Sequence, residues 1–201
     1  MVGIMDLTDQ KPTLKSGNEP LINGDKQLDF SLLDFWRWGN SDLLSNAARG
    51  IFAEFLVATA LGIKIEKPRE EWATYDLITP DGIKVEVKSA AYLQSWNQTR
   101  LSEIKFGIGK TKKFDLNGRM QNEPAQRWAD VYVFCLLAHQ DKRTVNPLDV
   151  SQWEFYVVAT KILDELCSER QSISLHPLRD ICRKAILYSD VLLEVNRVFV
   201  N

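Results

Sequence analysis

Alternating apolar and polar positions in the middle of the chain predict two neighbouring strands over residues 74–79 and 83–90. Between them lies the sequence TPDGI, whose proline, aspartate and glycine suit a three-residue hairpin loop. Such a loop pairs Thr79 with Ile83, so the two strands are expected to form a β-hairpin. A two- or four-residue loop would change the register, and every inference about facing side chains therefore depends on this turn.

Further patterns predict the elements that surround this hairpin. A helical apolar stripe starts after Ser41 or Ser45, either of which can cap it, and ends at Gly62, a residue suited to the left-handed C′ position. Residues 129–138 form an almost unbroken apolar run, which is typical of a central strand buried on both faces. The remaining predicted elements are strands over residues 63–67 and 153–160, a short helix over residues 161–169, and a helix that begins near Pro177.

The N-terminal region lacks such a pattern. Residues 1–27 are polar and rich in Gly, Pro, Lys and Asp, and we expect them to form a flexible arm. The sequence FSLLDFWRW that follows predicts a short helix whose Phe35, Trp36 and Trp38 pack onto the edge of the domain. Residues 28–201 are then expected to form a single domain of the α/β (α+β) class, in which helices surround a sheet.

Composition narrows the class of protein. Of the 201 residues, 45% are apolar and 26% are charged, as in ordinary globular proteins. No apolar run is long enough to cross a bilayer and the N-terminus lacks the features of a secretion signal, so we expect no membrane partner. Cys135, Cys167 and Cys182 are widely spaced without a CxxC pair, which favours reduced thiols in a cytoplasmic protein over a zinc site.

The predicted hairpin register brings charged side chains together. Because side chains alternate along a strand, Glu86 and Lys88 share one face, and Asp76 lies directly opposite Glu86 with Cβ atoms about 5 Å apart. Facing carboxylates repel unless a cation lies between them, and their oxygens suit a hard ion such as Mg²⁺ or Mn²⁺. With a lysine beside them to hold a water or offset a phosphate, these residues predict metal-assisted phosphodiester hydrolysis. The alternative is a solvated Glu-x-Lys pair on an exposed strand.

A glutamate in the predicted helix also needs an explanation. The helical neighbours of Glu54 are all apolar or small, so Glu54 lies in an apolar stripe. A buried carboxylate without a partner is costly. Two alternatives are open: Glu54 forms a salt bridge to Arg49 or sits at the helix edge, or it reaches the cation between Asp76 and Glu86.

The sequence RGIFAEFLVATALG followed by YDLITPDGIKVEVKSA resembles the PD-(D/E)XK nuclease superfamily, which has the restriction-endonuclease-like fold. The resemblance implies a central mixed β-sheet flanked by helices, with an αβββαβ core, and Mg²⁺-dependent cleavage of DNA. The site residues that it implies are the motif aspartate Asp76, the second acid Glu86, the lysine Lys88, the helix glutamate Glu54 and, as a further metal ligand, the backbone carbonyl of Val87.

This sequence departs from the superfamily pattern in two places. Tyr75 stands where the proline of the motif would be. No helix is evident between residues 91 and 128, although the superfamily places one after the motif strand. The order of strands beyond the hairpin is therefore left open.

Basic residues gather downstream of the motif strand. Between residues 100 and 119, six basic side chains are set against two acidic ones, in a protein whose net charge is −2. Lysines that contact phosphates give affinity for nucleic acid without reading its sequence. The expected contacts are Lys105, Lys110, Lys112, Lys113, Arg119 and, just after the motif strand, Gln94. The alternative is that this segment is a solvated loop.

These observations together predict a nuclease that depends on Mg²⁺ or Mn²⁺ and hydrolyses the phosphodiester bonds of DNA. A rival interpretation is a non-catalytic module that binds nucleic acid or protein on a nuclease-like scaffold. A third interpretation is a structural protein with a charged hairpin face. A homodimer is left open as a further assembly.

Overall fold

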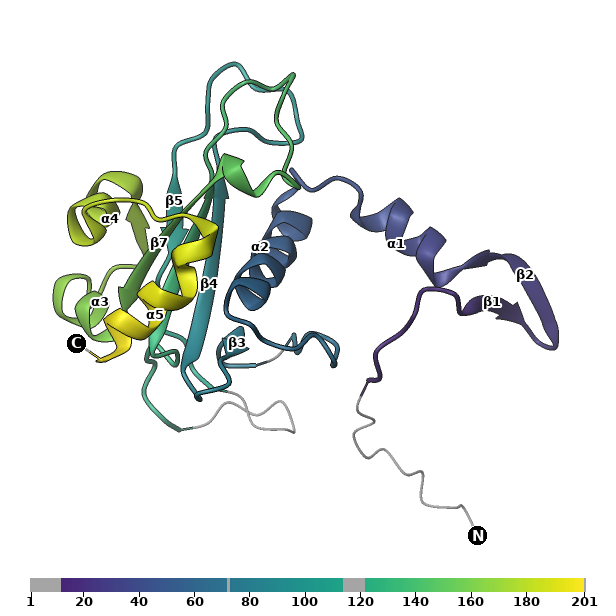
Figure 1. Cartoon of the computed structure of the whole chain (residues 1–201), viewed down its shortest axis with the longest axis horizontal. Coiled ribbons are helices and arrows are strands. Elements are labelled where there is room, and N and C mark those ends of the chain that lie inside the picture. Colours follow the sequence, from purple (N-terminus) through teal and green to yellow (C-terminus); the bar gives the residue numbers. More distant parts are fainter. Residues whose placement is uncertain (1–11, 72, 114–121, 201) are drawn as a thin grey trace, which may run out of the picture.

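The computed structural model describes residues 12–71, 73–113 and 122–200. Its centre is a four-stranded mixed sheet in which β4 and β6 are parallel and the outer pairs are antiparallel. In order across the sheet, the strands are β3 (Leu77–Ile78), β4 (Lys84–Ala91), β6 (Val131–Leu137) and β7 (Trp153–Ala159). Helices flank this sheet (Figure 1), which confirms the expected fold class.

Two helices cover one face of the sheet. They are α2 (Asn46–Ala60) and α5 (Val191–Val200), and they pack in one core cluster with the sheet. Val57 of α2 and Val195 of α5 are completely buried, as is Val85 of β4 on the facing strand. The predicted helix that ends at Gly62 is confirmed as α2, whereas α5 was not predicted, although Ser189 and Asp190 directly before it are residue types that start helices.

The ends of α2 follow from its sequence. The Ser45 hydroxyl accepts a hydrogen bond from the Ala48 N–H at 3.3 Å, which satisfies a donor of the first helical turn. Gly62 follows the helix with a φ of +68°, a backbone conformation that residues with a side chain disfavour. Ser45 rather than Ser41 is therefore the cap, and the predicted stop at Gly62 is confirmed.

A second layer covers the opposite face. It consists of α3 (Thr160–Leu166), α4 (Leu175–Cys182) and a small sheet made of β5 (Lys105–Gly107) and β8 (Ser172–Ser174). The Phe106 ring of β5 packs edge-on against the Phe134 ring of β6, with centroids 5.2 Å apart. Glu86 and Lys88 emerge on this same face, because they lie in register with Tyr132 and Phe134 of the neighbouring strand.

The buried Arg127 connects several segments of this second layer by hydrogen bonds. The Arg127 guanidinium donates to the carbonyls of Ile108 (2.7 Å) and Cys167 (2.9 Å) and to the Asp164 carboxylate (2.5 Å). Its side chain is completely shielded from solvent. Because Ile108 directly follows β5, Arg127 holds the segment that continues from this strand against α3.

Several predicted elements differ from the structure. Residues 63–67 form no strand, and the chain there runs irregularly with Ile65 exposed. α4 begins two residues before Pro177, so the proline lies in the first turn, where its missing N–H is not needed. The described part of the connection from β4 to β6 contains β5 and no helix, where the αβββαβ order has one. No helix within the described ranges is long and apolar enough to span a membrane.

The N-terminal segment contains regular structure that the sequence did not indicate. Within the stretch expected to be an irregular arm, β1 (Pro20–Asn23) pairs antiparallel with β2 (Lys26–Ser31). The predicted helix follows as α1 (Leu32–Asn40). Residues 12–45, which we call the N-terminal arm, project away from the sheet (Figure 1).

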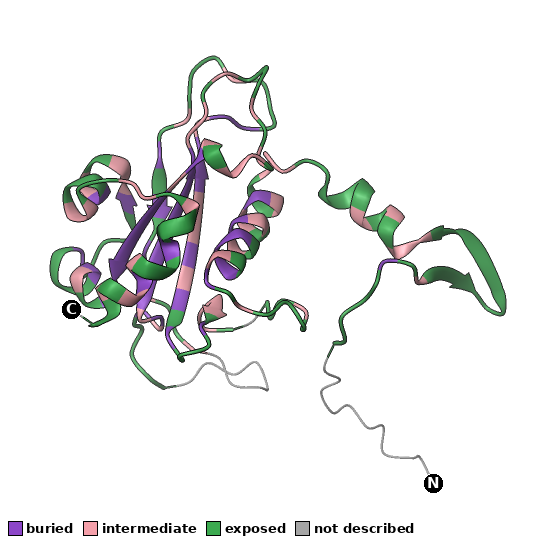
Figure 2. Ribbon diagram, viewed as in Figure 1, coloured by how far each residue is buried: buried purple, intermediate pink, exposed green. Residues whose placement is uncertain are grey.

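The predicted packing of α1 was wrong. Phe35 and Trp38 were expected against the domain edge, but they are 53% and 85% exposed. Trp36 packs locally instead, with its ring next to Gly17 of the same arm. The colouring by burial shows the whole arm as almost entirely exposed (Figure 2).

We expect Arg127→Ala to lower the free energy of unfolding by about 3 kcal/mol or more, because it leaves two buried carbonyls and a carboxylate without their donor. Arg143→Ala is the matched control, since Arg143 pairs with Asp141 on the surface and its side chain is 88% exposed. Denaturant unfolding of both variants measures the difference. Equal stability of the two variants would contradict the structural role of Arg127.

Candidate active site

The hairpin between β3 and β4 has the predicted register. The Thr79 N–H donates to the Ile83 carbonyl at 2.9 Å, and Gly82 has a φ of +86° in the loop. The two strands pair Leu77 with Val85 and Ile78 with Lys84, and Asp76, directly before β3, bonds to Val85 and Val87 on either side of Glu86. The turn chemistry read from the sequence thus determines which acidic residues meet.

Asp76 directly precedes β3, at the point where the edge of β4 is left without a partner strand. Its N–H donates to the Val85 carbonyl (3.1 Å), and its carboxylate accepts a hydrogen bond from the Val87 N–H (2.7 Å). The side chain therefore accepts the hydrogen bond that a backbone carbonyl of a longer β3 would otherwise accept. Because the N–H and C=O of one strand residue point to the same side, the Val87 carbonyl is directed to this edge as well.

The charge of Asp76 is poorly compensated. Burial, and then the neighbouring charge of Glu86, raise the pKa of Asp76 from 3.8 to about 6. Glu54 raises it further, while the hydrogen bond from Val87 and the charge of Lys88 act in the opposite direction. The edge of β4 therefore favours the binding of a cation, either a proton or a metal ion.

Glu86 and Lys88 leave the same face of β4. The Lys88 ammonium is 2.5 Å from a Glu86 carboxylate oxygen, and the two side chains are 32% and 18% exposed. Tyr132 lies beside Glu86 in the parallel register, and the pKa of its hydroxyl is raised by burial and, next, by the charge of Glu86. Tyr132 was missed as a candidate because it is one aromatic residue within an apolar strand.

Glu54 reaches the region of Asp76 from α2, and its partner is Arg69. The Arg69 guanidinium forms a bidentate ion pair with the Glu54 carboxylate, with N–O distances of 2.5 and 2.8 Å. These hydrogen bonds, with a further contribution from Asp76, raise the pKa of Arg69. The alternative pairing of Glu54 with Arg49 was wrong, since Arg49 is buried and donates to Gln94 at 3.3 Å. Arg69 lies in an irregular stretch without a sequence motif, so no signal could have found it.

A cavity of about 260 Å³ opens beside Glu86 and Lys88. Its other walls come from the second layer, from the segment just before β6 and from β6 itself, and they include Gly109, Lys110, Thr111, Trp128, Tyr132 and Gln171. The Trp128 indole N–H donates to the Thr111 carbonyl at 2.9 Å, which fixes this wall. The segment after β5, whose lysines were predicted to contact phosphates, thus borders the same cavity as Glu86 and Lys88.

Two of the predicted nucleic-acid contacts lie at this cavity. Lys110 lines it and forms an ion pair with Glu169 at 3.0 Å. The Lys113 ammonium lies 5.7 Å from the centre of the Trp128 ring. Lys110 therefore shares a cavity with Glu86, and Lys113 contacts a wall of that cavity, although both lysines are more than twenty residues away from Glu86 in the sequence.

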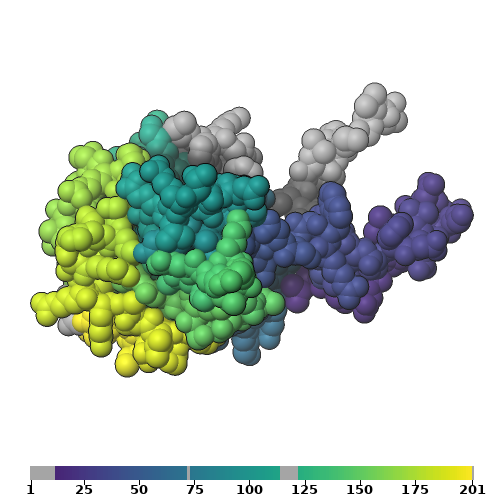
Figure 3. All heavy atoms as spheres, turned by 90° about the horizontal axis from the view of Figure 1, so that it is seen from above, coloured from purple at the N-terminus to yellow at the C-terminus, as the bar shows by residue number. Residues whose placement is uncertain are grey.

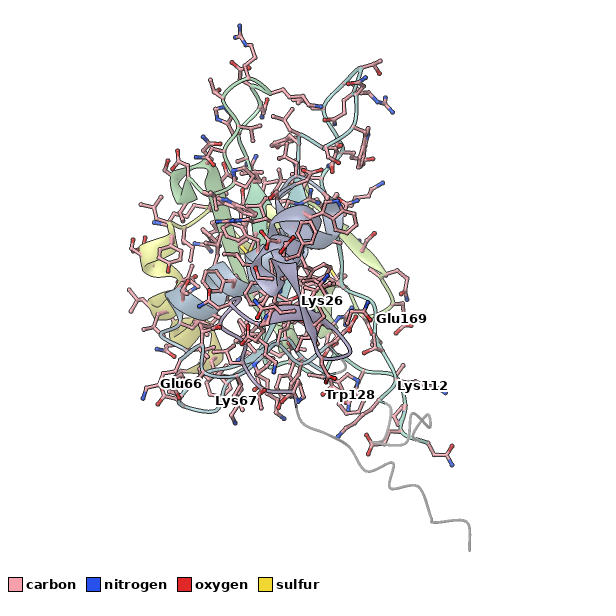
Figure 4. The ribbon with its side chains drawn as sticks, turned by 90° about the vertical axis from the view of Figure 1, so that its right-hand side faces the viewer. Lys26, Glu66, Lys67, Lys112, Trp128 and Glu169 are labelled. Atoms are coloured by element: carbon pink, nitrogen blue, oxygen red, sulfur yellow. The ribbon has the colours of Figure 1, made fainter. Side chains whose placement is uncertain are left out.

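The other predicted contacts have different surroundings. Lys105 pairs with Glu103 at 3.1 Å and is largely exposed. Lys112 is exposed at the same side of the molecule as Trp128, as Figure 4 shows. Arg119 lies outside the described residues. The prediction that Gln94 contacts nucleic acid was wrong. Gln94 is only 6% exposed, and its side-chain amide donates hydrogen bonds to Ala91 and Ser102 of the protein, so it presents no surface for nucleic acid.

The carboxylates of Glu54, Asp76 and Glu86 have different hydrogen-bond donors, which are Arg69, the Val87 N–H and Lys88 respectively. Across residues 12–71, 73–113 and 122–200, no three acidic, histidine or cysteine side chains gather at metal-binding geometry. The donor set at the edge of β4 is nevertheless the type that hard cations prefer: the carboxylates of Asp76 and Glu86 and the carbonyl of Val87, all oxygens. Together with the raised pKa of Asp76, this chemistry fits Mg²⁺ or Mn²⁺.

A comparison with known protein families bears on the activity of this chain. The family model of bacteriophage T4 endonuclease IV matches residues 29–175, which is well over half of the chain. The chain belongs to the bacteriophage T4 endonuclease IV family. It is therefore a nuclease, and its substrate is nucleic acid. No curated protein matches the chain.

The family match covers the whole candidate site of this endonuclease IV family protein. It includes Glu54, Arg69, Asp76, Glu86 and Lys88, and it also includes α1 of the N-terminal arm. It ends at the first residue of α4, so α5 lies outside it. The acidic residues and Lys88 thus lie within the matched region.

We expect Asp76→Asn to stabilise this endonuclease IV family protein when no metal is present. Because the pKa of Asp76 is raised in the folded state to about 6, the fold loses stability as the pH rises from about 4 through 6. The full shift corresponds to at most about 3 kcal/mol above pH 7. Asparagine stays neutral and still accepts the bond from Val87, so its advantage should vanish near pH 4.

Thermal unfolding in a chelator between about pH 3.5 and pH 8 measures this difference. Asp81→Asn is the control, because Asp81 lies exposed in the hairpin loop. A pH-independent effect of Asp76→Asn, or a loss of stability at pH 7.5, would show that Asp76 carries no uncompensated charge.

Proposed function

We propose that this protein is a divalent-metal-dependent nuclease that hydrolyses the phosphodiester bonds of DNA at a site of the PD-(D/E)XK type. The observation that carries the proposal is the meeting of Asp76, Glu86 and Lys88 at the open edge of β4, with the pKa of Asp76 raised to about 6. A solvated pair of charges on an exposed strand would not produce this shift. The motif residues occur in the predicted hairpin, which supports the resemblance on which the DNA substrate rests.

Asp76, Glu86 and the Val87 carbonyl would hold the metal ion. Bound Mg²⁺ or Mn²⁺ would act as a Lewis acid that stabilises the negative charge developing on the phosphate. Glu54 would contribute further negative potential at the same edge, since its charge already raises the pKa of Asp76. Its contact with Arg69 would keep this carboxylate in place.

Lys88 would position the attacking water and offset the charge of the phosphate. Its ammonium borders the cavity, and it can donate three hydrogen bonds, only one of which is used by Glu86 at 2.5 Å. Donors that are fixed before the reaction starts lower the barrier without a cost of reorganisation. The hydrogen bond to Glu86 fixes the ammonium in this way.

The cavity beside these residues would receive the nucleic-acid backbone. Lys110 borders it, and Lys112, Lys113 and Lys105 lie on the segment that leads into and out of it. Their contacts with phosphates would provide affinity that does not depend on sequence and falls with salt. Gln94 takes no part in this proposal, because its amide is buried.

One observation favours the alternative of a non-catalytic binding module. Glu54 and Glu86 each already have a basic partner, and no three possible metal ligands gather among the described residues. A scaffold that only binds nucleic acid would keep the lysines but need no metal. Cleavage and metal binding therefore have to be measured separately.

We expect the purified protein to cleave DNA in the presence of Mg²⁺, and Lys88→Met to lower the rate by at least about 100-fold, because the positioned donor is lost. Lys84→Met is the matched control, since Lys84 lies on the same face of β4, is exposed, and should be dispensable for cleavage. Duplex, single-stranded and branched DNA should be compared, with unfolding curves for each variant. A wild type as inactive as Lys88→Met on every form, or equally active in a chelator, would overturn the proposal.

We expect Mn²⁺ binding, measured by calorimetry without DNA, to weaken by at least about 10-fold in Asp76→Asn and in Glu86→Gln. The reason is that each substitution removes one charged oxygen donor. Glu103→Gln should bind like the wild type, because Glu103 is exposed and pairs with Lys105 away from the cavity. Undiminished binding in Asp76→Asn would place the metal elsewhere, and absence of binding in the wild type would favour the binding module.

A further inference from the structure

The N-terminal arm has secondary structure but no core of its own. Among residues 12–45 only Gly17 is buried, and α1 has no buried residue at all. A two-stranded hairpin alone is marginal in water, and so is an isolated helix as short as the nine residues of α1. The arm therefore needs a covering surface to keep this structure.

The body of the same chain does not provide that surface. In the described structure, the hydrogen bonds and ion pairs of residues 12–40 reach no further along the chain than Ser41. Where the chain enters α2, the Leu44 carbonyl accepts from the buried Arg49 at 2.9 Å, which fixes the point of exit. The space-filling view shows the arm standing clear of the body (Figure 3).

The arm instead exposes large apolar side chains. Ile22 is 65% exposed, Phe30 64%, Phe35 53% and Trp38 85%. An aromatic side chain can bury roughly 150–250 Å², so the three aromatic residues alone present roughly 300–400 Å². That is about half of the roughly 800 Å² that each partner contributes to a stable protein interface.

The charge of the arm argues against a nucleic-acid partner. Its described residues include the acidic side chains of Glu19, Asp25, Asp29, Asp34 and Asp42 and the basic side chains of Lys15, Lys26 and Arg37. This excess of acidic residues would be repelled by phosphates. An apolar, mildly acidic surface fits a protein partner.

A matching apolar surface lies on α2. Ile51 is 49% exposed and Phe55 48%, and the two residues are one helical turn apart on the same side of the helix. The Phe55 ring stacks on Phe52 with centroids 6.4 Å apart, so this patch is held firmly. In Figure 1, α2 is the body helix that lies nearest to the arm, on the side from which the arm departs.

We propose that two copies of this chain form a dimer by exchanging their arms, with β2 and α1 of each copy covering Ile51 and Phe55 of the other. Each contact then occurs twice around a two-fold axis, which closes the assembly at two chains. The exchange supplies the missing cover for the arm and doubles the apolar area that is buried. It involves none of the residues that are proposed to bind metal or phosphate.

The test is the mass of the full-length protein in solution, measured by sedimentation equilibrium over a range of concentrations. The wild type is expected at twice the 23.0 kDa of one chain. Phe30→Ser/Trp38→Ser in the arm and Ile51→Ser/Phe55→Ser in α2 should each raise the dimer dissociation constant at least about 30-fold, as expected for the loss of central apolar contacts. Leu187→Ser is the control, because Leu187 is equally apolar and 67% exposed but lies elsewhere.

A mixture of the two double variants distinguishes exchange from other contacts. The arm of the α2 variant and the α2 surface of the arm variant are both intact, so a mixed dimer should form more tightly than either variant alone. A monomeric wild type, a dimer that survives the arm substitutions, or a dimer that survives the α2 substitutions would each overturn the proposal. Lys88→Met should dimerise like the wild type, so failure of the nuclease proposal leaves this result unaffected.

Discussion

The geometry of this site depends on one hydrogen bond at a strand edge. β3 has only two residues, so the backbone of β4 is uncovered from Val87 onward, and the Asp76 carboxylate accepts the free N–H at 2.7 Å. This contact holds Asp76 beside Glu86 in spite of their repulsion, and burial of the carboxylate then raises its pKa. A longer β3 would satisfy the edge with backbone groups and leave no reason for the acid to turn inward. The short strand is therefore what converts a hairpin into a candidate cation site.

The second layer gives this edge a surface for a substrate. Glu86 and Lys88 face the side of the sheet on which β5 and β8 pack, and the chain after β5 forms the opposite wall of the cavity. Arg127 holds that wall through buried bonds to Ile108 and the end of α3. The position of Lys110 is thus set by packing within the second layer. Charge and cavity come from parts of the chain that are distant in sequence, and the fold makes them neighbours.

Local chemistry explains which features the sequence could predict. The TPDGI loop determined the hairpin register, the apolar run determined the central strand, and Gly62 marked the end of α2, because each depends on adjacent residues. For the start of α2 the sequence offered both Ser41 and Ser45. Arg69, by contrast, meets Glu54 through an irregular loop, and Gln94 is buried by a long-range contact with Arg49. The exposure of the arm could not be foreseen either, since its aromatic residues have the composition of a core. Pairings between distant segments leave no periodic signal in one sequence.

The balance of charge around the edge of β4 connects the proposed cofactor with the proposed substrate. Glu54, Asp76 and Glu86 are offset by Arg69 and Lys88, which leaves one negative charge when all five are ionised. A divalent cation would reverse this to one positive charge, and a phosphodiester carries one negative charge. The site would then bind its substrate only after the metal, because the metal-free edge repels a phosphate. On the proposed function, the basic partners of Glu54 and Glu86 keep the excess negative charge to one unit, so that a single divalent ion suffices to attract the substrate.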